Sequence, residues 1–595
     1  MTVTLQQVPA NGSTIGHDRV KRFSRRSRTG CRTCRARRIK CDEAPGACNN
    51  CTSTKRVCEG YDVHRIPAVR GRRRAEADAA TAASWSLLNA GPVSIEPAIS
   101  SRVQWKVTSD ERRCLSFFQY RSVPQLVAFF DSPVWQQLVL QLCYHEPAVF
   151  HAVVALGAVN QGHESARRNR AYPPGPAQRK AMQKQEKWYL FALEQSGRSF
   201  ALLNKRRMSE DPYLRTIILV CCLLFVMCEL LHRNITTAIW HVQSGLRILS
   251  GMRITRHVCG LNLTGPSMFN ESIVETFLGL QGSSVFFGTK ETLPIDQSFV
   301  FEQPYDTYLR PFSSLQQARK VLLPLLHTLW LFVAQCMKAS DAQRAAMYSA
   351  LQRQQHLLLT YFTRFLHLFD TFCLTTYGTT TFTSTSMPLS LAHAARKAHR
   401  TAELTRLSVV TSIFCTKTAT ALTSQSQPLP ELYATECEAI IAAAENAMRN
   451  LKADLDGASP TLTPQHEIVP AVYVASVRCP DLGVCCRGIA ALREWHSEEG
   501  FMSASLCAAI LEEALKMRLK CLYDHCAELP EGLSFLMGHD GRVSARIVYR
   551  VDEEERTHTV ILGRNKALVA DLLAIEGSRD WPCVRALGLL DHVYC

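Results

Sequence analysis

The sequence of 595 residues lacks an apolar run long enough to cross a bilayer. Its longest apolar run, Ile217 to Cys228, has twelve residues, well short of the ~20 that a spanning helix needs. Residues 1–30 also lack the apolar stretch that a secretory signal requires. We therefore expect no membrane partner, a reducing compartment in which disulfides are absent, and a buried helix at the twelve-residue run.

Signatures of common enzyme classes are absent as well. The sequence has no Gly-x-Gly-x-x-Gly, P-loop, Gly-x-Ser-x-Gly or kinase motif, and His145-Glu146-Pro147 does not continue as a zinc-protease motif. Cys485 and Cys486, with His496 nearby, could be imagined as nucleophile and base. Adjacent residues of a helix, however, point about 100° apart. We therefore expect that the chain is not an enzyme.

Cysteine is distributed very unevenly. Of 24 cysteines, six lie between Cys31 and Cys58, and the other 18 form no further C-x2-C pair. The scattered 18 are predicted to be small core residues. His64 is the only histidine between Cys31 and the end of the following linker, which excludes a finger built on paired histidines.

The six clustered cysteines form an internal repeat. Their spacing is C-x2-C-x6-C-x6-C-x2-C-x6-C, in which the unit C-x2-C-x6-C occurs twice; the residues are Cys31, Cys34, Cys41, Cys48, Cys51 and Cys58. Zinc prefers four tetrahedral ligands. Six thiolates can satisfy two such ions only if two sulfurs are shared, so the arithmetic favours a bridged cluster of two zinc ions. A degenerate or redox cysteine cluster remains the alternative.

Positive charge is concentrated at the same end. Residues 1–80 hold 18 Lys/Arg against 7 Asp/Glu, a net +11, within a chain whose formal charge is +16. Four basic residues lie between the second and third cysteines: Arg35, Arg37, Arg38 and Lys40. Such clustering favours a polyanionic partner, although nuclear import or anionic lipid would also explain charge alone.

The chain divides into four predicted parts. These are a disordered basic arm (1–28), the cysteine module (29–62), an Arg- and Ala-rich linker (63–109) and a long helical region (110–595). Apolar residues three and four apart, such as Trp135, Leu138, Val139 and Leu142, predict helices. Helix breaks are expected at Pro147, 173–176, Pro212, Pro304, Pro388 and Pro428, a loop at 375–386, and a β-hairpin at 546–551 and 557–562 joined by the acidic residues 552–555.

The cysteine spacing, together with the Arg-x-Arg-Arg-Ile-Lys-Cys-Asp run from Arg35 to Asp42, resembles the fungal Zn2Cys6 DNA-binding family. The resemblance implies two zinc ions bridged by Cys31 and Cys48. Cys34 and Cys41 would complete one site, and Cys51 and Cys58 the other. The family usually has proline two residues before its fourth cysteine, whereas Pro45 lies three before Cys48.

The same resemblance implies how DNA is bound. Arg35, Arg37, Arg38 and Lys40 would lie in a short helix that enters the major groove, with Arg38 at a base edge of a CGG-type half-site. Arg35, Lys40, Lys55 and Arg56 would contact phosphates. The expected function is therefore a sequence-specific transcription factor acting in the nucleus on double-stranded DNA.

Residues 110–565 resemble, less specifically, that family's regulatory region. The matching segments begin at Glu111, Cys222 and Ile468, and the last includes Glu499 and Gly500. The resulting fold prediction is mainly α: a small Zn2Cys6 module, then a large all-α regulatory domain with a C-terminal β-hairpin. Because residues 74–88 show no heptads, any homodimer is expected to form through the helical region. The alternative function is a corepressor or interaction protein whose zinc cluster is only structural.

Overall fold

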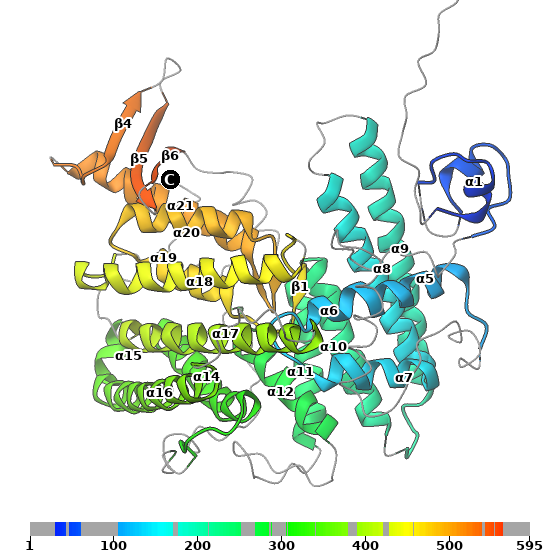
Figure 1. The fold of residues 1–595 in the computed structure, drawn as a ribbon, viewed down its shortest axis with the longest axis horizontal. Coiled ribbons are helices and arrows are strands. Elements are labelled where there is room, and N and C mark those ends of the chain that lie inside the picture. The colour runs from blue at the N-terminus through cyan, green and yellow to red at the C-terminus, as the bar shows by residue number, and fades with distance from the viewer. Residues whose placement is uncertain are drawn as a thin grey trace, which may run out of the picture.

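The computed structural model describes residues 30–60 and 105–562, with internal gaps of which the longest are 170–175, 252–267, 288–304, 379–388 and 420–427. The predicted basic arm, nearly all of the linker and the turn residues Asp552 and Glu553 lie outside the described residues. Figure 1 shows a small module at one edge of the molecule and two groups of helices beside it.

The module contains two short helices, α1 (Arg32–Ala36) and α2 (Asn49–Thr52). The first group of helices comprises α5 (Ser109–Phe117), the π-helical turn η2 (Phe118–Ser122), α6 (Val123–Leu126), a second π-helical turn η3 (Val134–Leu138), α7 (Val139–His145), α8 (Pro147–Asn169), α9 (Pro176–Lys205), α10 (Leu214–Leu231), α11 (Ile235–Gly251) and α12 (Met268–Ser284). These helices enclose one continuous apolar core.

The first group starts at a well-defined helix cap. The Thr108 side chain accepts a hydrogen bond from the Glu111 backbone N–H at 3.3 Å, and the Glu111 carboxylate accepts one from the Thr108 backbone N–H at 2.8 Å. Helix α8 then packs against α5 at Gly157, where a Cβ atom would lie 2.3 Å from the Cys114 carbonyl oxygen. Only glycine permits this approach of the two helices.

The second group comprises α14 (Leu315–Lys338), α15 (Asp341–Ala346), α16 (Tyr348–Tyr377), α17 (Leu389–Ala419), the 3-10 turn η6 (Glu431–Tyr433), α18 (Ala434–Asp454), α19 (Ile468–Val477), α20 (Leu482–Glu494) and α21 (Ala504–His525). In Figure 1, α16, α17 and α18 lie in successive layers. One apolar core is shared by α14, α16 and α17, and another is shared by α17, α18, α19, α20 and α21.

A buried carboxylate fixes the start of α19. Glu499 Oε2 accepts hydrogen bonds from the backbone N–H groups of Glu467, Ile468 and Val469 at 2.9–3.0 Å, and Oε1 accepts one from Trp495 Nε1 at 2.8 Å. The carboxylate thus occupies the N-terminus of a helix, where negative charge is favoured. The two ends of the third segment that resembles the family's regulatory region, Ile468 and Glu499, are therefore in direct contact.

The mainly α prediction is confirmed, and the described strands form two small sheets. Strands β5 (Val543–Val551) and β6 (Glu554–Ile561) form the predicted antiparallel hairpin, and β4 (Leu533–Met537) pairs with the other edge of β5. Glu554 and Glu555 belong to β6 rather than to the turn. Strands β1 (Leu462–Thr463), β2 (Glu498–Glu499) and β3 (Met502–Ser503) form the second sheet. Neither β4 nor this second sheet was predicted.

Several predicted breaks coincide with helix boundaries. Helix α8 begins at Pro147, α10 begins two residues after Pro212, and α17 begins directly after Pro388. The predicted 375–386 loop is wrong at its first residues, because α16 continues to Tyr377. Residues 379–388 lie outside the described residues.

Two described helices are long and apolar enough to cross a membrane by length and composition alone, α10 and α16. The twelve-residue apolar run lies within α10, and 78% of that helix is buried inside the protein, so the predicted core helix is confirmed. The most apolar window of α16 is 33% buried. Its inner face packs Phe362, Phe365 and Phe369 into a core, whereas Arg353 and Arg364 are exposed.

Candidate metal centre

The structure brings all six predicted cysteines together in two overlapping sets. Cys31, Cys34, Cys41 and Cys48 form one set, and Cys31, Cys48, Cys51 and Cys58 form the other; within each set the sulfurs lie within 4.8 Å of one another. Cys31 and Cys48 belong to both sets. These are the two residues that the resemblance to the Zn2Cys6 family implied as bridges.

The sulfur spacing fits zinc. Cys31 and Cys48 Sγ are 3.6 Å apart, Cys34 and Cys48 Sγ are 3.5 Å apart, and Cys31 and Cys51 Sγ are 3.8 Å apart. A tetrahedron with Zn–S bonds of about 2.3 Å has edges of about 3.8 Å. Burial raises the pKa of the Cys34 and Cys48 thiols, and a bound cation would offset this by stabilising the thiolates.

The two halves of the module share one local conformation, displaced by 17 residues. Cys31 and Cys48 each precede a short helix and accept a hydrogen bond on sulfur, from the backbone N–H of Cys34 and Cys51 respectively, at 3.3 Å. After each helix one residue adopts the left-handed conformation, Arg38 at φ 54° and Lys55 at φ 51°. The sequence repeat is thus also a structural repeat.

Polar side chains join the halves. Asp42 accepts hydrogen bonds from the backbone N–H groups of Asn49 and Asn50, at 3.0 and 3.3 Å, and so caps the start of α2. Arg37 Nη1 donates to the Asn50 carbonyl at 3.3 Å and to Thr54 Oγ1 at 3.0 Å. Asp42 belongs to the basic motif that ends at Cys41-Asp42, but the motif did not predict these hydrogen bonds, because the partners lie several residues downstream.

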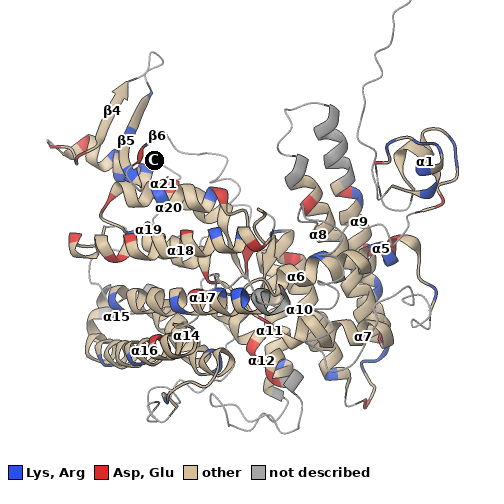
Figure 2. Cartoon of the chain, in the orientation of Figure 1, with Lys and Arg blue, Asp and Glu red and all other residues tan. Residues whose placement is uncertain are grey.

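The basic residues do not all lie in α1 as expected. The helix ends at Ala36, so it contains Arg35, whereas Arg37 is its C-terminal cap and Arg38 and Lys40 follow it. A helix of five residues ends early here because Arg38 turns to positive φ. Arg38, Lys40, Lys55 and Arg56 are exposed, whereas Arg35 and Arg37 are partly buried. Figure 2 shows Lys and Arg along the module around α1.

The module also contacts the helical body. Lys187 Nζ on α9 donates a hydrogen bond to Asn49 Oδ1 at 2.6 Å. Gly60, at φ 76°, lies so close to the start of α5 that a Cβ atom there would be 2.6 Å from Ser109 Oγ. The sequence offered no signal for either contact, because both join residues far apart along the chain.

The imagined catalytic grouping is not supported by the local environments. Cys485 and Cys486 are buried, and the Cys485 thiol donates to the Ser476 carbonyl at 3.2 Å. His496 is exposed, with its Nδ1 3.2 Å from the Glu494 carbonyl oxygen. The neighbouring Cys479 thiol and burial raise the pKa of Cys485, and burial raises the pKa of Cys486. Both shifts are opposite to what an activated nucleophile needs.

Comparison with known families gives two matches. Residues 29–65 match the fungal Zn(2)-Cys(6) binuclear cluster domain, a domain that holds two zinc ions. Residues 113–280 match the fungal specific transcription factor domain, and this stretch runs from α5 to α12. The chain therefore carries both domains that are found in the fungal Zn2Cys6 transcription regulators, the family whose resemblance the cysteine spacing suggested.

Individual relatives of the chain are also named as regulators. The chain is 32% identical over 228 residues to the aspercryptin biosynthesis cluster-specific transcription regulator of Emericella nidulans, covering 38% of this chain and 35% of that protein. It is 44% identical over 70 residues to white-opaque regulator 2 of Candida albicans, covering 12% and 15%. With transcriptional regulatory protein moc3 of Schizosaccharomyces pombe it shares 63% identity over 41 residues, 7% and 8% of the two chains.

The matched segments thus span about a third or less of each of these three relatives. No solved structure matches the chain.

Proposed function

We propose that this chain is a sequence-specific, DNA-binding transcription regulator whose residues 29–62 hold two zinc ions. The observation that carries the proposal is the overlap of two four-sulfur sets at Cys31 and Cys48. Shared thiolates allow six ligands to complete two tetrahedral sites. Cys34 and Cys41 then complete one site, and Cys51 and Cys58 complete the other.

The zinc ions supply folding rather than reaction chemistry. Residues 30–60 bury little besides the cysteines, which form a small apolar cluster of their own, so metal binding provides the stabilisation that a larger core would give. The ions fix α1 and the left-handed turn after it, and thereby orient the basic side chains that follow Cys34.

The basic residues of the module then divide by role. We assign Arg38 to a base edge of a CGG-type half-site, because a guanidinium can donate two hydrogen bonds to guanine O6 and N7. Lys40, Lys55 and Arg56 contact phosphates, and Arg35 adds a further phosphate contact from α1. Arg37 takes a smaller part than the other five, because its guanidinium already joins the two halves of the module.

Further features of the proposal concern the rest of the chain. Residues 1–28 are a basic arm, 63–109 a linker and 110–595 a regulatory region through which a homodimer forms. The protein acts in the nucleus and regulates a pathway or gene cluster. The printed name of the Emericella nidulans relative, a cluster-specific regulator, supports that last assignment.

Selection from a pool of random duplexes tests the proposal. The zinc-loaded full chain should enrich a sequence that contains CGG, and chelation of zinc should abolish the enrichment. Cys34→Ser should fail to enrich it, whereas Cys521→Ser should behave as the unchanged protein, because Cys521 is exposed on α21 and far along the chain from the module. Two bound zinc ions without any enrichment would instead support the corepressor alternative.

A further inference from the structure

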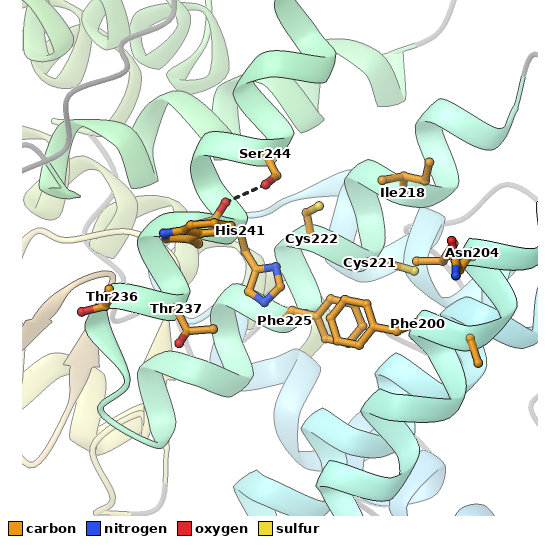
Figure 3. A pocket seen from close by; sticks show the side chains of 13 residues that line it. Phe200, Asn204, Ile218, Cys221, Cys222, Phe225, Thr236, Thr237, His241 and Ser244 are labelled. Atoms are coloured by element: carbon orange, nitrogen blue, oxygen red, sulfur yellow. Dashed lines mark hydrogen bonds between the residues drawn. The ribbon is translucent and has the colours of Figure 1, made fainter. Parts of the chain in front are cut away.

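A pocket opens between α9, α10 and α11, in the part of the chain that matches the fungal specific transcription factor domain. Its volume is about 1030 Å³, which is similar to the largest typical small-molecule sites. Figure 3 shows side chains from all three helices converging on it. Ile218, Cys221 and Cys222 from α10 form part of its apolar lining.

Aromatic rings stack on one another at one wall of the pocket. The Phe200 ring from α9 stacks on the Phe225 ring from α10, with centroids 4.3 Å apart and planes 18° apart. The His241 ring from α11 is 6.0 Å from Phe200 and almost parallel to it. Trp240 also lines the pocket and leaves 66% of its surface exposed. Phe225 is only 3% exposed, so the rings left to stack against another planar ring are Phe200, which is 45% exposed, and Trp240.

The pocket is also uncharged. None of the described residues that line it is Asp, Glu, Lys or Arg. Burial lowers the pKa of His241, which favours its neutral imidazole. A charged ligand would lose its hydration here without meeting an opposite charge.

A few polar groups face the rings. Thr236, Thr237 and Ser244 from α11 line the pocket, and the Ser244 hydroxyl donates to the Trp240 carbonyl at 2.8 Å. Within the described part of the chain, the His241 ring nitrogens have no hydrogen-bond partner. An imidazole nitrogen and threonine hydroxyls can each accept or donate a hydrogen bond to an uncharged polar group.

We propose that this pocket binds a neutral, planar aromatic small molecule. Its ring system stacks between Trp240 and Phe200, which rests on the buried Phe225 ring, and one uncharged polar group lies beside His241. The hollow shape and the hydroxyl lining favour such a ligand over a second copy of this chain, which would require an apolar surface that projects into the pocket.

Fluorescence titration of the full zinc-loaded chain tests the proposal with a defined probe. Nile red, a neutral planar dye, should bind saturably with one molecule per chain. Trp240→Ala and Thr237→Lys should each weaken binding at least tenfold, the first by removing a stacking ring and the second by placing a charge in the pocket. Both positions are exposed, so the fold should tolerate both changes.

Controls separate the pocket from general surface binding. Tyr213→Ala removes another exposed aromatic ring, 74% exposed and outside the lining, and should leave Nile red affinity unchanged. The anionic dye anilinonaphthalene sulfonate should not displace Nile red. Absence of saturable binding, equal affinity in the Trp240 and Thr237 variants, or displacement by the anion would each overturn the proposal. So would a dimer in sedimentation that depends on Trp240 and is dissociated by Nile red, because the second copy would then be the occupant.

Discussion

Arg38 and Lys55 offer a matched pair of substitutions, because they occupy equivalent turns of the two halves with φ of 54° and 51°. In this conformation a residue with a Cβ atom is strained by roughly 1–2 kcal/mol, and glycine is not. Arg38→Gly and Lys55→Gly therefore remove the side chain without a penalty to the fold. Any loss of DNA binding then reports the lost contact rather than a damaged module.

The two changes should differ in kind. Loss of a bidentate guanine contact costs ~1–3 kcal/mol, so Arg38→Gly should weaken binding to the selected duplex by roughly 5- to 150-fold and leave a scrambled duplex almost unaffected. Lys55→Gly should weaken binding to both duplexes alike, and should lower the slope of log affinity against log salt by about 0.9. Fluorescence anisotropy with both duplexes across a salt series measures all of these quantities.

Zinc content, measured on the same samples, should remain at two ions per chain in both variants. The assignment of Arg38 is refuted if Arg38→Gly retains the specificity ratio of the unchanged protein. It is equally refuted if Lys55→Gly, and not Arg38→Gly, lowers that ratio.

Three further predictions concern metal binding and stability. Cys31→Ser should lose both zinc ions in native mass spectrometry, whereas Cys34→Ser should keep the other site, and two zinc ions in Cys31→Ser would exclude the bridge. Gly157→Ala should lower the free energy of unfolding in a urea titration by ~1–3 kcal/mol, because its Cβ would overlap the Cys114 carbonyl oxygen. Gly279→Ala is the control: a Cβ there would have nothing within 4 Å, so the same titration should show a free energy of unfolding higher by roughly 0.5–1 kcal/mol. Burial lowers the pKa of His327 to about 4, so the unfolded chain takes up the proton first and stability falls as pH drops below about 6.5. Between about pH 7 and 5, the free energy of unfolding of His327→Leu should therefore fall by about 2 kcal/mol less than that of the unchanged protein. Denaturant titrations followed by circular dichroism measure both values, and an equal fall in the two proteins would contradict the buried, neutral imidazole.

The sequence predicted the metal centre well because its determinants are local. A C-x2-C turn places two sulfurs on one side of a short helix, and the count of six ligands restricts how two zinc ions can be held. The helical body was predictable as a class for a related reason, since periodic apolar residues and proline positions act within one helix. The coincidence of the α8 start with Pro147 is an example.

The parts that escaped prediction depend on residues distant in sequence. Glu499 caps α19 from more than thirty residues away, and no local pattern reports such a partner. The early end of α1 follows from the left-handed turn at Arg38, a conformation that an arginine does not signal. The pocket requires three helices to converge, and its neutral lining is visible only once their faces are placed.

The sulfurs of Cys31 and Cys48, common to both four-cysteine sets, also bear on how the module would respond to zinc supply. With separate sites, occupancy would rise gradually, one ion at a time. With shared thiolates, the first ion deprotonates and positions two ligands of the second, so filling becomes concerted and the half-filled module stays scarce. DNA binding would then switch on over a narrow range of free zinc, which makes the module a threshold device for metal availability rather than a graded one.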